Sequence, residues 1–109
     1  MTATIATIQR IVCRVWRVDE GVMTSDQLSP HFAQARQAAM HLARKHGCRE
    51  VDVAPAFGRN KSSVRYAVRV VDRRLPTDAA FRLLYEEAAA AARRALHCPT
   101  CGARRQEAA

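Results

Sequence analysis

Long apolar runs and chain-breaking residues are scarce in this sequence. Only four glycines and four prolines occur in 109 residues, and aromatic residues make up 6%. No segment approaches the roughly 18 consecutive apolar residues that a membrane-spanning helix needs. The N-terminus also lacks the charged, apolar and small-residue regions of a signal peptide. We therefore expect neither a membrane protein nor a secreted one, but a cytoplasmic protein.

Patterns typical of enzymes are missing as well. Four histidines and ten acidic residues are scattered along the chain without a nucleophile motif. A phosphate-binding G-x-x-x-x-G-K-[ST] motif is absent, which excludes ATP-driven chemistry by this chain alone. Strand-like alternation and internal repeats are also lacking. The sequence predicts an all-α protein that is not an enzyme.

Positive charge is abundant and unevenly distributed. The net charge is +8, and residues 31–75 carry ten Lys or Arg against three acidic residues, a balance of +7. Such a block favours a polyanionic partner, because neutralising phosphates releases condensed counterions. A solvated basic surface and an anionic membrane surface are the alternatives.

Apolar residues recur at helical spacing along most of the chain. The spacing predicts helices at residues 4–18, 31–46, 62–75 and 78–97, with a shorter helix at 52–57. The predicted core positions are Ile5, Ile8, Val12, Val15, Trp16, Phe32, Ala35, Ala39, Met40, Leu42, Ala43, Val64, Ala67, Val68, Val71, Leu75, Phe81, Leu84, Ala88, Ala91, Ala95 and Leu96.

Capping and breaking residues set the expected boundaries. Thr4 or Thr7 is a candidate cap of the first helix, and Pro30 is expected to end the polar segment 19–30. Gly47 stands where a helix takes a left-handed terminating residue. Pro55 is tolerable only if its helix begins around Asp52, since an interior proline removes a hydrogen bond.

The short helix at 52–57, the turn with Gly58 and the helix at 62–75 have the form of a helix-turn-helix. Asn60 or Ser62 can cap the second helix, Pro76 ends it, and Thr77 or Asp78 can cap the next one. In this motif the start of the second helix meets base edges in the major groove of DNA.

Two segments, ARQAAMHLARKHG (residues 35–47) and VDVAPAFGRNKSSVRYAVRVVDRRL (residues 51–75), resemble the C-terminal DNA-binding domain of the bacterial replication initiator DnaA. That family carries Arg-Gln-x-Ala-Met-Tyr-Leu-Ala-Arg on one helix and Gly-Arg-Asp-His-Thr-Thr-Val at the turn and recognition helix. The matching or nearly matching residues are Arg36, Gln37, Ala39, Met40, Leu42, Ala43, Arg44, Gly58, Arg59, Ser62, Ser63 and Val64. The resemblance implies a DNA-binding domain over residues 1–75, an additional helix over 76–97, and a short tail over 98–109.

The resemblance further implies double-stranded DNA as the partner, bound at the nucleoid. We expect Arg36, Gln37 and Ser62 or Ser63 to position the DNA backbone, and Asn60, Lys61 and Arg65 to read bases. Arg59 and Arg69 complete the candidate site; a solvated helix face is the alternative for these charges.

The sequence also departs from the family at its base-reading positions. Asn60-Lys61-Ser62-Ser63 stands in place of Asp-His-Thr-Thr, and the family's basic loop has no Lys or Arg here between Arg17 and Arg36. Because Asp, Asn and Lys pair with different bases, we expect a target that differs from the usual initiator box.

The segment HCPTCGARR places Cys98 and Cys101 at the C-x-x-C spacing of a zinc knuckle. This is half a site, which His97, Cys48 or a second chain would complete; a tail with a redox-labile pair is the alternative. Cys13 and Cys48 are expected to be small buried hydrophobes. A homodimer through the last helix or the C-x-x-C is a further expectation. If these segments serve association instead, the chain is an interaction module with little DNA binding.

Overall fold

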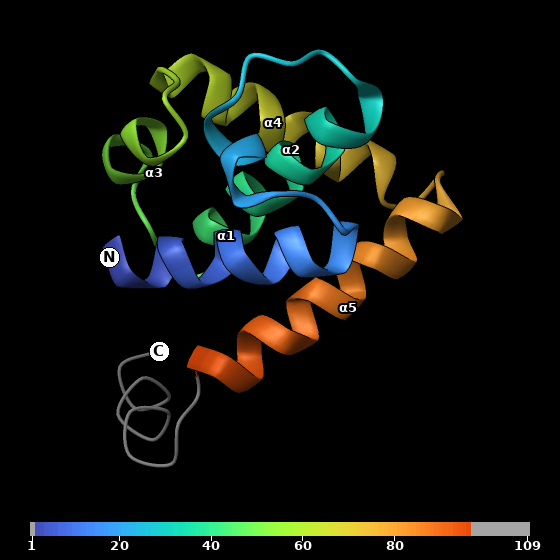
Figure 1. Cartoon of the computed structure of the whole chain (residues 1–109). Helices are drawn as coiled ribbons and strands as arrows, with labels where there is room; N and C mark the ends of the chain where they lie inside the picture. Colours follow the sequence, from blue (N-terminus) through green and yellow to red (C-terminus); the bar gives the residue numbers. More distant parts are fainter. Residues whose placement is uncertain (1, 97–109) are drawn as a thin grey trace.

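Within residues 2–96, which are those that the computed structural model describes, five α-helices and one 3-10 helix follow one another without a strand. They are α1 (Thr2–Trp16), η1 (Glu20–Thr24), α2 (Pro30–Lys45), α3 (Glu50–Ala56), α4 (Lys61–Arg74) and α5 (Ala79–Leu96) (Figure 1). The predicted all-α fold with an extra C-terminal helix is thereby confirmed.

Helix α2 is the centre of the arrangement. It packs against α1, η1, α3 and α4, while α5 packs along α1 (Figure 1). Ala35, Ala38, Ala39 and Ala43 of α2 are fully buried, and their small side chains allow the neighbouring helices to approach closely. The helix that carries the Arg-Gln pattern is therefore the platform on which α3 and α4 are held.

Most of the core positions predicted from the helical spacing of apolar residues are buried in the structure. Trp16, Leu42, Val64 and Val71 are at most 1% exposed, as expected, and the free thiols of Cys13 and Cys48 are buried among them. Val15, Phe32, Val68, Leu75, Leu84, Ala91 and Leu96 are only partly buried. The predicted face of α5 was partly wrong: Ala95 is exposed, while Tyr85 and Ala92, which were not predicted, are buried.

The helix boundaries differ from the predicted ones by one or two residues, and three of these differences concern residues that were expected to set a boundary. Helix α1 begins at Thr2, before both candidate caps, and Pro30 begins α2 at its first turn instead of only ending the loop. This position suits proline, whose missing N–H has no partner in the first turn of a helix. Pro55 lies inside α3, which begins at Glu50 and not at Asp52.

Two glycines end helices as the sequence predicts. Gly47 follows α2 with φ of +89° and Gly58 follows α3 with φ of +64°. Arg17, which directly follows α1, has a φ of +58°, a conformation that favours glycine. Because an arginine stands at this position, the sequence carries no glycine that would mark the end of α1.

A partly buried polar cluster joins α5 to α2 and α4. His41 of α2 forms hydrogen bonds with the Tyr85 hydroxyl through Nδ1 (2.6 Å) and with Asp72 Oδ1 of α4 through Nε2 (2.8 Å). Burial, together with the nearby charge of Asp72, raises the pKa of Tyr85, so its hydroxyl stays protonated. The extra helix is therefore joined to the core of the domain by both apolar packing and hydrogen bonds.

Candidate nucleic-acid interface

Helices α3 and α4 form a helix-turn-helix. The chain reverses at Gly58, and the Arg59 amide donates to the Ala54 carbonyl at 2.9 Å, which closes the turn. Asn60 is the N-cap of α4, since its Oδ1 accepts a hydrogen bond from the Ser63 amide at 2.9 Å. Val64 and Ala67 then fix the inner face of α4 in the core.

The outer face of α4 carries polar and basic side chains. Lys61, Ser62, Arg65 and Arg69 are exposed, and Ser63 is partly exposed. The structure thus brings these five predicted residues together on one helix, starting at its first turn. Asn60 is exposed as well, but its Oδ1 already serves as the cap, so a bidentate contact with adenine requires that oxygen to accept a second hydrogen bond.

Two apolar side chains at this face were missed by the sequence interpretation. Tyr66 of α4 is 54% exposed, and Leu28, in the loop before α2, is 89% exposed. Both border a groove of about 460 Å³ that is also lined by Gln37, Asn60 and Ser62. The sequence could have indicated Tyr66, because this residue follows Ser62 by four positions and therefore lies one turn further along the same face of the helix.

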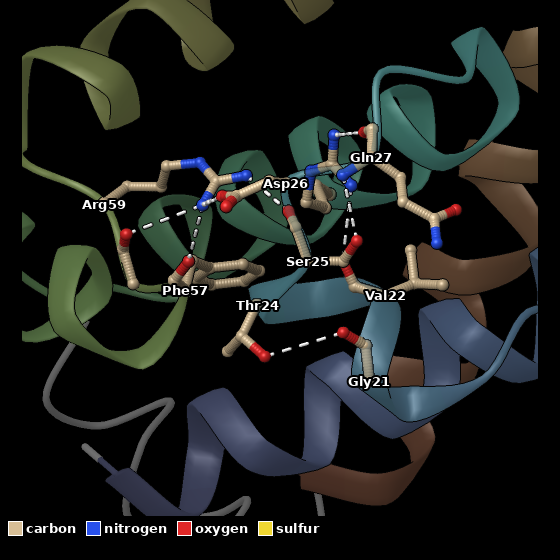
Figure 2. Close-up of polar contacts among 10 residues, drawn as sticks. Gly21, Val22, Thr24, Ser25, Asp26, Gln27, Phe57 and Arg59 are labelled. Carbon is tan, nitrogen blue, oxygen red and sulfur yellow. Dashed lines mark hydrogen bonds and ion pairs between the residues drawn. The ribbon is translucent and has the colours of Figure 1, made fainter.

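The Arg59 side chain is only partly exposed, and its guanidinium is bound within the protein. Its Nη2 donates to the Ser25 carbonyl at 2.7 Å, and its Nη1 lies 3.4 Å from the Phe57 carbonyl and 3.8 Å from Asp26 Oδ1. Figure 2 shows this guanidinium between the turn of the helix-turn-helix and the loop that precedes α2. Arg59 therefore holds the loop against the turn.

Arg36 departs from its predicted role as a DNA-backbone contact. It is 5% exposed, and it donates to the Gln27 carbonyl at 2.6 Å and to the Val22 carbonyl at 3.3 Å. Burial and the neighbouring charge of Arg59 lower the pKa of Arg36 from its ordinary value. The guanidinium thus donates to one carbonyl of η1 and to one carbonyl of the loop that follows it. Arg36 therefore also holds this loop in place.

Pairing inside the protein reduces the number of free positive charges. Six of the ten Lys and Arg side chains of residues 31–75 contact a carboxylate or a backbone carbonyl: Arg36, Arg44, Arg49, Arg59, Arg65 and Arg74. Arg65 is half-exposed and pairs with Glu50 of α3 at 3.1 Å. Among residues 2–96, the side chains of Lys45, Lys61, Arg69 and Arg73 have no such partner, and three of these four lie on α4. Within residues 31–75, the free charge is therefore concentrated on the second helix of the motif.

The cysteine pair of the predicted zinc knuckle, Cys98 and Cys101, lies outside the described residues, and so does His97. Within residues 2–96 no group of three His, Cys, Asp or Glu side chains is placed to hold a metal ion. Zinc binding stays a prediction, and metal analysis of protein purified without a His tag will test it.

No helix in the described part of the chain is long and apolar enough to cross a bilayer.

Comparisons with known proteins agree with this geometry. Residues 5–71 match the family described as the bacterial DnaA protein helix-turn-helix. The chain is 33% identical over 87 residues to the chromosomal replication initiator protein DnaA from each of two strains of Porphyromonas gingivalis. These matches cover 78% of this chain but only 18% of the relatives. The chain therefore belongs to the bacterial DnaA helix-turn-helix family, a family of DNA-binding domains.

Proposed function

We propose that this protein binds double-stranded DNA with a sequence preference of its own by placing the start of α4 in the major groove. The observation that carries this proposal is the concentration of unpaired cations on α4 beside the exposed Asn60, Ser62 and Tyr66. Phosphate contacts supply affinity and register, whereas contacts with base edges supply specificity. A helix face that offers both kinds of group suits both tasks.

The side chains divide between these tasks by their position along α4. Lys61 and Ser62 in the first turn are placed to reach base edges, as is the free amide nitrogen of Asn60. Arg69 and Arg73, two to three turns further along, are placed to reach phosphates. Tyr66 lies between the two groups and offers an apolar surface to a thymine methyl.

The loop before α2 supports a target that differs from the initiator box. It has no Lys or Arg, its Asp26 is fully exposed, and Arg36 and Arg59 hold its backbone in place. A fixed, acidic loop adds no cation to the minor groove. We infer that base contacts from α4 carry more of the specificity here.

The biological role that follows is occupation of specific sites at the nucleoid, either to regulate transcription or to modulate replication by competing for or marking sites. This chain matches only 18% of the length of the initiators it resembles, and it has no phosphate-binding G-x-x-x-x-G-K-[ST] motif. Binding without ATP hydrolysis therefore suffices for the proposed role.

Selection of bound sites from random duplex DNA tests the proposal. We expect an enriched motif other than the usual initiator box, and recovery of that box as the preferred site would contradict the altered specificity. Lys61→Ala should weaken binding to the selected site by about 1–3 kcal/mol if Lys61 reads a base. Lys45→Ala is the matched control, because Lys45 is an unpaired, exposed lysine on α2.

Salt dependence separates this function from its alternative. Duplex binding should weaken steeply as salt is added, since bound phosphates release counterions. If no salt-sensitive binding to any duplex is found, the chain is better described as an interaction module.

A further inference from the structure

A second group of cations, with no carboxylate partner among residues 2–96, lines a groove between α1 and α5. Arg10 and Arg14 of α1 and Arg94 of α5 line this groove, which measures about 390 Å³. All three side chains are exposed. Within residues 2–96, none of their guanidinium groups lies within 4.0 Å of a carboxylate.

The sequence of both helices leaves this charge without compensation. Helix α1 contains no Asp or Glu, and the last nine residues of α5, from Ala88 to Leu96, contain only arginines as charged residues. Neighbouring cations of this kind repel one another, and an anion placed between them relieves that repulsion. The groove is also lined by small or apolar side chains, Thr7, Ile11, Ala91 and Ala95, and the Thr7 hydroxyl accepts a hydrogen bond from Arg10 Nη2 at 3.4 Å.

The groove is separate from the helix-turn-helix. Figure 1 shows α5 beneath α1, on the side of the molecule away from α4. Helix α4 packs on α2 and α3, whereas α5 packs on α1, so α1 and α2 lie between the two basic surfaces. When α4 is inserted into the major groove of one duplex, the protein groove between α1 and α5 therefore stays accessible.

We propose that the α1–α5 groove binds the phosphate backbone of a second DNA duplex, so that one protein molecule bridges two duplexes. This inference rests on the proposed function for the first duplex. Arg10, Arg14 and Arg94 contact phosphates and read no bases, so the second duplex is held without sequence preference. Because this contact is purely electrostatic, bridging fails at lower salt concentrations than site binding does.

The test is capture of a second duplex. A duplex with the selected site is fixed on beads, the protein is added, and a fluorescent duplex of unrelated sequence is offered at low salt. The site variant is Arg10→Gln with Arg94→Gln. The matched control is Arg17→Gln with Arg93→Gln, which removes the same charge just after α1 and in α5 but outside the groove. Fluorescence anisotropy measures site binding by each protein separately.

We expect the site variant to capture at least about tenfold less of the second duplex, with site binding nearly unchanged, and the control to capture it as the wild type does. Three results would overturn the inference: no capture by the wild type, equal losses in both double variants, or full capture by the site variant. The last result would point to bridging by a protein dimer.

Two further results distinguish the bridging proposal from the helix-turn-helix proposal and from binding to a membrane surface. If duplex binding is insensitive to Lys61→Ala but is lost in the Arg10→Gln, Arg94→Gln variant, the helix-turn-helix proposal fails and the groove remains a DNA site. If the wild type captures no second duplex but sediments with phosphatidylglycerol vesicles through the same two arginines, the groove binds a membrane surface and the bridging proposal is wrong.

Discussion

Arginines of this protein differ in role according to where their carbonyl and carboxylate partners lie. Arg59 and Arg69 are both candidates from the sequence, yet Arg59 donates to the Ser25 carbonyl whereas Arg69 is exposed and has no partner among residues 2–96. The first residue therefore contributes to folding and the second is available to DNA.

Alanine substitutions should separate these two roles. Arg59→Ala leaves the loop carbonyls without their donor and should lower the free energy of unfolding by about 1–2 kcal/mol, measured by urea denaturation. Arg69→Ala should change stability by less than about 0.5 kcal/mol, yet reduce the salt slope of DNA binding by about 1. A large loss of stability in Arg69→Ala with none in Arg59→Ala would contradict the assignment.

The buried thiol of Cys13 predicts a dependence of stability on alkaline pH. Burial, with smaller contributions from Glu20 and Asp19, raises the pKa of Cys13 to about 11. The folded state therefore keeps its proton at pH values where the unfolded chain, with a thiol pKa of about 8.5, has lost it. The stabilisation is complete below the unfolded pKa and is lost as the pH rises toward 11.

We expect the free energy of unfolding to fall between about pH 9 and pH 11, by up to about 1.4 kcal/mol per pH unit from this thiol. Cys13→Ala should show a shallower decline in denaturation curves measured across this range. Since Cys48 and Tyr85 also have raised pKa values, part of the decline will remain. Identical slopes in both proteins would show that Cys13 ionises equally in both states.

At the scale of elements, Asn60 has a structural task that the base-reading assignment did not include. Its Oδ1 caps α4, so Asn60→Ala should destabilise the protein by about 1 kcal/mol. Asn60→Asp preserves the cap and places a negative charge at the positive end of the helix dipole, so stability should be kept. Thermal denaturation of both variants checks this order.

The same two variants test base reading once stability is accounted for. Asp accepts from cytosine N4, whereas Asn pairs with adenine. If Asn60 contacts a base, the site selected by Asn60→Asp will differ from the wild-type site at one position. An unchanged selected site would restrict Asn60 to capping.

At the scale of the whole molecule, α5 belongs to the same hydrophobic core as the helix-turn-helix domain. Phe81 is 2% exposed; its ring lies edge-on to Trp16 at 5.9 Å, and the Arg74 guanidinium lies 5.6 Å from its centroid. These contacts connect α5 with α1 and with the end of α4. The boundary expected at residue 75 therefore separates two parts of the sequence, but α5 and residues 1–75 share one packed core.

Phe81→Ala should therefore destabilise the entire domain, by about 3–5 kcal/mol. This is a large part of the 5–15 kcal/mol that is typical of folded domains. Leu83→Ala is the control on the same helix, since Leu83 is 68% exposed, and it should have little effect. Equal melting temperatures for the two variants would show that α5 is dispensable.

Local patterns were sufficient for much of this architecture. The helices, the terminating Gly47 and Gly58, and the family resemblance depend on residues close together in the chain. The face of α5 was harder to predict, because its alanines offer little contrast between sides, and the buried Tyr85 is selected by its contact with His41 of α2. Tyr66 was missed because the predicted site consisted of charged and polar side chains alone.

The sequence by itself determined an all-helical, basic protein of the DnaA helix-turn-helix family, since helical spacing, turn residues and motif order are local properties. Only the tertiary structure decided which charges are free. Arg36 and Arg59 face loop carbonyls contributed by residues 22–27, whereas Arg10, Arg14 and Arg94 meet in a groove without a carboxylate. The physical reason is that burial and pairing of a charge depend on segments distant in sequence, which come together only in the folded chain.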